Sequence, residues 1–128
     1  MQQAQGALTL AGRTMLALMF LLSGLGKIGS VAGTQGYMEA KGVPGVLIWP
    51  AIVLEIGGAL AVMVGAGTRW ASGLLCVFTV LTAVIFHRQF SDQVQMFMFL
   101  KNVAIAGGFL YLLAFGPGRW SWDERKTR

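Results

Sequence analysis

The sequence predicts an all-α integral membrane protein: an antiparallel bundle of four spanning helices with both termini in the cytoplasm. Hydrophobic residues make up 55% of the 128 residues and charged residues only 12%, whereas about a quarter of the residues in soluble domains are charged. Four apolar runs approach the roughly 20 residues that a spanning helix needs, and short segments rich in glycine or proline separate them. The length suits a single domain, residues 1–128.

The predicted spans follow one another along the chain, and each ends at a recognisable break. The first covers about residues 8–28, and the second, about 47–64, follows a Gly-Val-Pro-Gly turn. Only residues 65–69 join it to the third span, about 70–86, so these two helices must be antiparallel neighbours. The fourth, about 96–115, ends at a Gly-Pro-Gly turn. The longest connection, about 29–46, is expected to fold partly as an interfacial helix or cap.

The distribution of basic residues predicts the orientation. With four spans, the two termini share one side of the membrane. That side would hold Arg13, Arg69, Arg119, Arg125, Lys126 and Arg128, whereas the opposite loops hold only Lys27, Lys41 and Arg88. The positive-inside rule therefore places both termini in the cytoplasm. Because the basic residues are scattered over segment ends, the net charge of +5 does not indicate a nucleic-acid partner.

Glu55 is the most informative residue, because it interrupts the otherwise apolar second span. It lies about 8 residues, or roughly 12 Å, from the outer end of that span. A carboxylate at such a depth costs several kcal/mol and normally requires a partner or a polar cavity. The topology brings Lys27, His87, Lys101 and Asn102 to the outer half as well. We expect these five side chains to converge on the bundle axis as an intramembrane polar cluster or ligand site.

Helical spacing supports inward-facing stripes that include these residues. One stripe joins Glu55 to Gly58 and Ala59, a second runs from Ser72 through Cys76, Thr79 and Ala83 to His87, and a third joins Lys101 to Ala104, Ile105 and Gly108. Tyr37, Phe97 and Phe99 are expected to supply aromatic walls, because Phe97 and Phe99 share helix faces with Lys101 and Asn102. Arg13 and Arg69 are expected to anchor the cytoplasmic face.

A structural interpretation of the cluster stays open. Glu55 paired with Lys27 or Lys101 can serve only to fix the helix register, a role that is well attested for buried ion pairs. A metal site is not predicted, because the single His, the single Cys and the deep carboxylate lie on separate helices without ligand spacing. The lone Cys76 also excludes an intrachain disulfide and is expected to be a packing residue.

Several short motifs in order resemble the DoxX family over about residues 8–122. They are Arg13, Ser23-Gly24-Leu25-Gly26-Lys27-Ile28, Tyr37-Met38, Leu54-Glu55-Ile56-Gly57-Gly58, Phe86-His87 and Lys101-Asn102. The resemblance implies a four-helix, multi-pass protein of the bacterial inner membrane. The family takes its name from a subunit of an archaeal thiosulfate:quinone oxidoreductase, which implies a redox setting. It supplies no agreed catalytic residues.

Three functions remain in competition. The first is a quinone-interacting membrane subunit of a redox pathway, in which cationic and amide donors bind the quinone carbonyl oxygens and a partner protein exchanges the electrons. No covalently bound cofactor is expected. The second is a membrane scaffold or anchor for a partner enzyme. The third is a small transporter or proton relay using Glu55 and His87, for which four spans would require a homo-oligomer. Whether the protein is an enzyme is left open by the sequence.

The topology can be tested with reporter fusions at Lys41 and at the C-terminus. The excess of basic residues beside the termini predicts a periplasmic signal from the first fusion and a cytoplasmic signal from the second. Alkaline phosphatase and green fluorescent protein report these two sides. The same side for both fusions would exclude the four-span topology.

Overall fold

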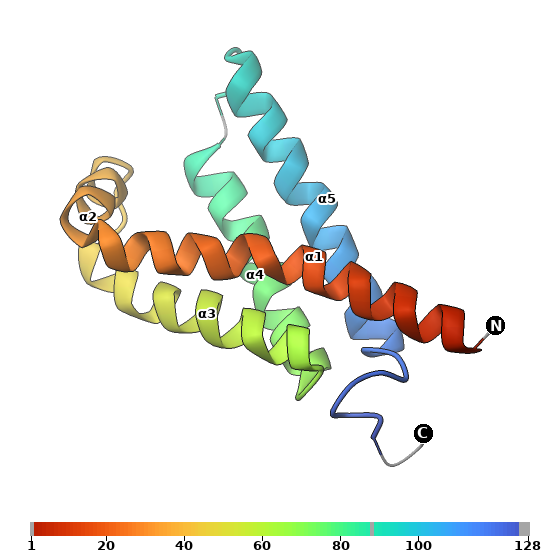
Figure 1. The fold of residues 1–128 in the computed structure, drawn as a ribbon. Coiled ribbons are helices and arrows are strands. Elements are labelled where there is room, and N and C mark those ends of the chain that lie inside the picture. The colour runs from red at the N-terminus through yellow and green to blue at the C-terminus, as the bar shows by residue number, and fades with distance from the viewer. Residues whose placement is uncertain (1, 88, 126–128) are drawn as a thin grey trace.

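The structure, a computed structural model, describes residues 2–87 and 89–125. It contains long helices joined by short connections, coloured in Figure 1 from red at the N-terminus to blue at the C-terminus. The elements are α1 (Gln2–Gly29), α2 (Val31–Ala40), a short 3-10 helix η1 (Gly45–Leu47), α3 (Ile48–Val64), α4 (Thr68–Phe86) and α5 (Gln93–Phe115). Arg88, Lys126 and Arg128, which the charge argument used, lie outside the described residues.

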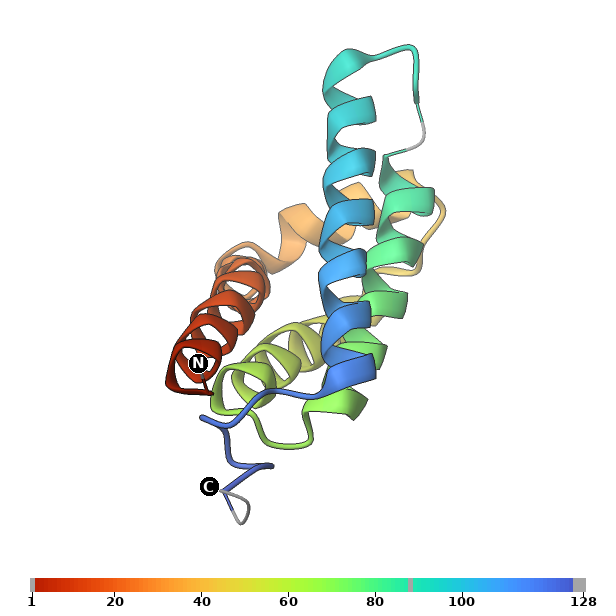
Figure 2. The same ribbon diagram turned by 90° about the vertical axis from the view of Figure 1, so that its right-hand side faces the viewer.

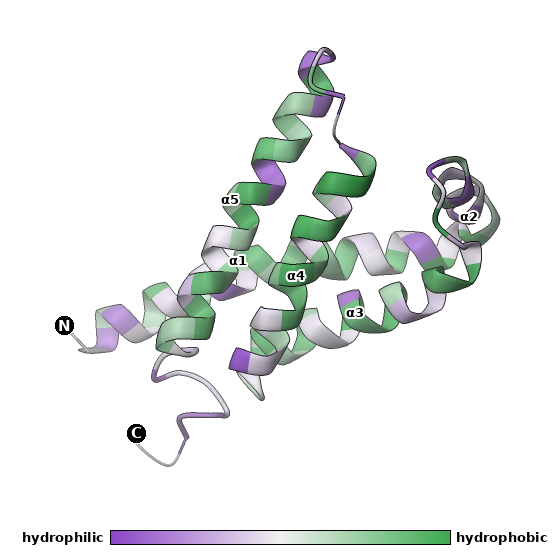
Figure 3. Cartoon of the chain, turned by 180° about the vertical axis from the view of Figure 1, so that it is seen from behind, coloured by the Kyte–Doolittle hydropathy of each residue, from purple (hydrophilic) through white to green (hydrophobic). Residues whose placement is uncertain are grey.

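The described residues contain four helices that are long and apolar enough to cross a membrane, which confirms the four predicted segments. The predicted boundaries of the second and third spans differ from α3 and α4 by two residues at most, whereas α1 and α5 begin earlier than predicted. The longest connection forms α2, as expected for a partly helical cap. Hydrophobic residues cover much of the outside of all four long helices (Figure 3). Such a surface suits contact with lipid.

The four long helices form two antiparallel pairs, α1 with α3 and α4 with α5. The α4–α5 pair leaves the α1–α3 pair at an angle, and α5 extends outward beyond the end of α4 (Figure 2). This differs from the predicted bundle about one common axis. The core that all four helices share explains the shape: it is built from Ala17, Phe20, Ala59, Val62, Ala71, Leu75, Cys76, Ala106, Phe109 and Leu112. These residues lie toward the end where α3 turns into α4, so the opposite ends are free to diverge.

We call the end that holds the start of α1, the α3–α4 turn and the C-terminal segment the terminal face, and the opposite end the outer face. At the outer face α2 connects the two pairs. The ring of Tyr37 on α2 stacks on that of Phe86 at the end of α4, with 5.3 Å between centroids. Met38, Ile48 and Ile52 form a small buried cluster beneath this contact.

Small residues permit the close helix contacts that packing in lipid requires. A Cβ atom on Gly24 of α1 would lie 2.6 Å from Ile56 on α3, and one on Gly58 of α3 would lie 3.2 Å from Leu75 on α4. The stripe predicted on the second span, Glu55 with Gly58 and Ala59, is buried, as is the stripe from Ser72 to Ala83 on the third. These two faces were therefore predicted correctly.

The C-terminal tail, residues 116–125, folds back over the terminal face and closes the end of α3. The last carbonyl groups of a helix have no partner within the helix. Here Arg13 donates to the carbonyl oxygens of Val62 (2.9 Å) and Met63 (3.2 Å). The backbone amide of Trp122 donates to the carbonyl oxygen of Val64 (3.1 Å). Arg13 also donates to the tail carbonyls of Pro117 and Trp120.

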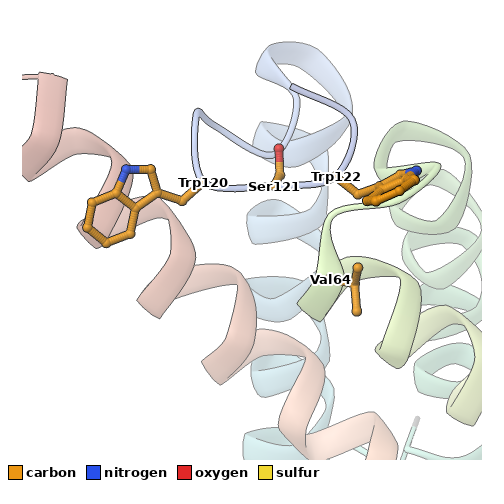
Figure 4. Close-up of a pocket in the computed structure, with 4 residues that line it drawn as sticks. All are labelled: Val64, Trp120, Ser121 and Trp122. Carbon is orange, nitrogen blue, oxygen red and sulfur yellow. The ribbon is translucent and has the colours of Figure 1, made fainter. Parts of the chain in front are cut away.

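The same tail holds the start of α4. The carboxylate of Asp123 accepts hydrogen bonds from the amides of Gly67 and Thr68, each 2.8 Å long, and so acts as a helix cap supplied from a distant part of the chain. Figure 4 shows Trp120 reaching toward α1 and Trp122 lying beside the α3–α4 turn, near Val64. The tail therefore connects α1, α3 and α4.

The charge of Asp123 should make the docking of the tail sensitive to acid. Burial by itself raises the pKa of the Asp123 carboxyl, but the amides of Thr68 and Gly67 and the charge of Arg125 outweigh it, so this pKa lies below its ordinary value. A carboxylate whose pKa is lower in the folded state stabilises that state above its unfolded pKa, and the contribution is lost as the pH falls through the folded value. Docking should weaken accordingly below about pH 4.

Asp123→Asn should lower the free energy of unfolding at neutral pH by about 1 kcal/mol, because its side chain keeps only one acceptor oxygen for the amides of Gly67 and Thr68. It should also reduce the loss of stability between about pH 5 and pH 3. The midpoint of thermal unfolding in detergent measures both effects, with Glu39→Gln on the exposed side of α2 as the matched control. An acid dependence identical to that of the wild type would show that Asp123 does not control docking.

Candidate functional site

The candidate site is a charged pair between α1 and α3 in the outer half. The Nζ atom of Lys27 lies 2.6 Å from Oε1 of Glu55, and it also donates to Oγ of Ser23 at 2.9 Å. Ser23 and Lys27 are four residues apart and share one face of α1. Gly24 lies between them in sequence, and a Cβ there would come within 3.3 Å of the Glu55 Cβ. Close helix packing thus brings the carboxylate to the ammonium group.

Glu55 is buried, with 1% of its side chain exposed, whereas Lys27 is 22% exposed. The second carboxylate oxygen of Glu55, Oε2, has no hydrogen-bond partner among residues 2–87 and 89–125. A lysine ammonium has three N–H donors, and Ser23 and Glu55 take two of those on Lys27. The pair therefore retains one donor on Lys27 and one strong acceptor on Glu55. Such a pair can bind a group that both accepts and donates hydrogen bonds.

Asn102 occupies a separate place, between α5 and α4. It is buried, and its Nδ2 donates to the carbonyl oxygen of Thr79 and to Oγ1 of Thr82, both at 3.3 Å. Cys76 makes a similar contact one turn away, from Sγ to the carbonyl oxygen of Ala106 at 3.6 Å. Polar side chains in this arrangement hold neighbouring helices together in lipid. The structure thus gives Asn102 and Cys76 packing contacts between α4 and α5.

His87 lies at the outer end of α4, and its Nδ1 is 3.1 Å from Oε1 of Gln95 on α5. This contact joins the residue that directly follows α4 to the first turn of α5. His87 is half-buried. It therefore belongs to the junction of α4 with α5, and the ion pair of Glu55 is formed with Lys27.

Lys101 does not face the interior, and this corrects the stripe predicted for the fourth span. The side chain of Lys101 is exposed, as is Ala104. The buried face of α5 instead carries Asn102, Ala106, Phe109 and Leu112. Adjacent helical residues point about 100° apart, so the burial of Asn102 against α4 turns Lys101 outward. The predicted convergence of all five residues is replaced by a Lys27–Glu55 pair and separate contacts.

The three aromatic residues expected to form walls lie at different places. Tyr37 stacks on Phe86 at the outer end of α4. Phe99 packs edge-on against Phe90 in the α4–α5 connection, with centroids 5.1 Å apart. Phe97 is 59% exposed. These positions follow from the extension of α5 beyond α4, which carries Phe97 and Phe99 away from α3. Within the described part of the chain, no three His, Cys, Asp or Glu residues lie together as metal ligands would.

Comparisons with known proteins agree with this architecture. The DoxX family model matches residues 8–88. The chain belongs to the DoxX family. Two relatives are inner membrane proteins of Escherichia coli: YqjF is 44% identical over 97% of this chain and 95% of its own length, and YphA is 36% identical over 95% and 92%. The yeast ER-derived vesicles protein ERV29 is 28% identical over 97% of this chain, which spans 35% of ERV29. No solved structure matches.

These findings confirm the family assignment and the localisation. This DoxX protein is an integral, multi-pass protein of the bacterial inner membrane. The match to residues 8–88 includes both members of the Lys27–Glu55 pair. It also includes Arg13, which was predicted to anchor the cytoplasmic face.

Arg13 does more than anchor one face of the protein, which is the role predicted from the sequence. It is only 2% exposed, and four carbonyl oxygens surround its guanidinium group. The sequence did contain a signal for this burial: Arg13 lies inside an apolar run, where a charged residue is as unusual as Glu55 is in the second span. The partners of Arg13 are backbone groups of α3 and of the tail, which leave no trace in the sequence pattern.

The Lys27–Glu55 pair predicts a clear order of stability among variants. Lys27→Met leaves a buried carboxylate without its cation and should lower the free energy of unfolding by about 3 kcal/mol. The double variant Lys27→Met/Glu55→Leu should recover most of this loss, because replacing both members of a buried pair by apolar residues is often neutral. Glu55→Gln, which keeps an acceptor for Lys27, should cost less than Glu55→Leu. Unfolding in mixed micelles measures all four variants.

Lys101→Met serves as the matched control, because it removes the same charge from an exposed position on α5. Its effect on stability should stay within about 0.5 kcal/mol. Equal losses for Lys27→Met and Lys101→Met would contradict a structural role specific to the pair.

Proposed function

We propose that this DoxX protein is a quinone-interacting membrane subunit of a redox pathway, and that the head group binds at the Lys27–Glu55 pair. The observation that carries the proposal is the unused hydrogen-bonding capacity of the pair. One donor remains on Lys27 and one acceptor remains on Glu55 Oε2 within the described residues. A quinone carbonyl accepts the first, and a quinol hydroxyl donates to the second.

The pair also suits the proton chemistry of a quinone. Oxidation of a quinol to a quinone releases two protons and two electrons. In the quinol form, Glu55 takes one proton from the hydroxyl group that donates to it, and the second hydroxyl proton passes to water at the outer face. In the quinone form, Lys27 donates to a carbonyl oxygen. The electrons pass to a redox partner protein, which the proposal requires. The outer half of the helices is apolar around the pair, and Leu22, Leu25 and Ile28 of α1 expose side chains that suit an isoprenoid tail.

The proposed site is smaller than the one expected from the sequence. Asn102 and His87 have contacts between α4 and α5, and Lys101 is exposed on α5. The head group is therefore assigned to two charged residues and Ser23, which orients the lysine.

Equilibrium binding of a short-chain quinone analogue to the detergent-solubilised protein tests the proposal. Lys27→Met/Glu55→Leu should bind at least about tenfold more weakly than the wild type, because hydrogen bonds to charged groups contribute about 1.5–3 kcal/mol. This double variant is chosen because its fold should be preserved. Lys101→Met is the control and should bind like the wild type. Equal affinity for all three proteins would place the ligand elsewhere.

A membrane scaffold is the second candidate, and the same pair favours it in one respect. Lys27 and Glu55 form an ion pair at 2.6 Å that fixes the register of α1 against α3. An anchor for a partner enzyme needs such a rigid pair and no ligand. Absence of quinone binding to the wild type, together with the recovery of a soluble partner in mild detergent, would replace the quinone proposal by this one.

A further inference from the structure

A groove on the terminal face lies between the start of α1 and the end of α5. It has a volume of about 570 Å³. Gly6 and Thr9 of α1, Tyr111 and Phe115 of α5 and Arg119 of the tail are among the residues that line it. The groove lies at the opposite end of the molecule from the Lys27–Glu55 pair, so it is independent of the proposed quinone site.

The packing of α1 against α5 explains why the groove opens toward the terminal face. Deeper in the membrane the two helices touch, since a Cβ atom on Gly108 would lie 3.0 Å from the methyl groups of Leu16. Nearer the terminal face the tail passes between them, with Trp120 against Gly6 and Gly118 against Thr9. The residues of α5 that line the groove run from Tyr111 to Phe115, a rise of roughly 6 Å along the helix. This depth accommodates the upper part of an acyl chain below a head group.

The groove combines an apolar wall with a cation at the level of the membrane surface. Tyr111 and Phe115 are 71% and 76% exposed and stack with their centroids 6.2 Å apart. Arg119 lies in the tail, four residues after the end of α5 at Phe115. A guanidinium group matches the geometry of a phosphate and binds it through paired hydrogen bonds. Basic pockets between spanning helices recognise anionic lipid head groups in this way.

We propose that this groove binds one anionic phospholipid, with its phosphate against Arg119 and the first part of an acyl chain along Tyr111 and Phe115. Charge complementarity supports an anionic lipid over a zwitterionic one. The guanidinium group of Arg69 lies beside the end of α5, with its nitrogen 3.4 Å from where a Cβ on Gly116 would be. A second positive charge therefore stands next to the groove. The net charge of the whole chain is +5.

Titration of the detergent-solubilised full chain with short-chain phosphatidylglycerol, followed by native mass spectrometry, tests this site. Arg119→Gln should weaken binding roughly fivefold, the effect of one basic residue near an anionic lipid. Gln5→Trp, which fills the groove without changing the charge, should weaken it at least as much. Arg125→Gln is the matched control, because the guanidinium of Arg125 stacks on Trp122 at 3.8 Å and does not line the groove. It should bind like the wild type.

Each other outcome counts against the proposal. Equal losses for Arg119→Gln and Arg125→Gln would indicate diffuse attraction to a basic face. Equal binding of phosphatidylcholine would show that the anionic charge is not recognised, and displacement by inorganic phosphate at equal concentration would indicate a phosphate site without a lipid chain. Unchanged binding in Gln5→Trp would place the lipid outside the groove. Melting midpoints of the variants in detergent establish that they remain folded.

Discussion

The last carbonyl groups of a helix find no donor within the helix, and at the end of α3 the donors come from α1 and the C-terminal tail. Arg13 supplies two of the donors and the tail supplies others, so α1, α3 and the tail are fixed together by one guanidinium group. Asp123 extends the arrangement to the first amides of α4. Arg13 and the tail thus hold the tight α3–α4 turn and the shared core beside it in place. The helices diverge toward their opposite ends.

The sequence predicts the helices well because hydropathy depends only on composition along the chain. The partner of Glu55 was also among the predicted ones, since depth in the membrane limits which cations can reach it. The rotation of α5 was not predictable, because Lys101 and Asn102 are adjacent polar residues and either can face inward. The neighbouring helix determines which of the two faces inward, because Thr79 and Thr82 on α4 offer acceptors to Asn102. The burial of Arg13 was missed for a related reason. Its partners are backbone carbonyl groups, and because every residue has one, the sequence does not show which of them Arg13 contacts.

The polar residues of the outer half divide according to the helix pairs. Lys27, Ser23 and Glu55 belong to the α1–α3 pair, whereas Asn102, Thr79 and Thr82 belong to the α4–α5 pair. The second group consists of neutral hydrogen bonds to backbone and hydroxyl oxygens, which serve packing. The first contains the buried charge and the unsatisfied oxygen Glu55 Oε2. The deep carboxylate therefore belongs to the α1–α3 pair, and the neutral hydrogen bonds of the α4–α5 pair make it a rigid support.

The docking of the tail on Arg13 has a consequence for biosynthesis. A ribosome makes α1 first, and the groups that surround its guanidinium are made later: the end of α3 about 50 residues on and the tail about 100 residues on, by the sequence separations of these bonds. During insertion Arg13 must therefore remain near water or lipid phosphate, as basic side chains at a membrane surface do. It becomes buried only when the last segment arrives. Assembly of the terminal face is then a late event of maturation. A fusion partner attached directly after α5, in place of the tail, would prevent it.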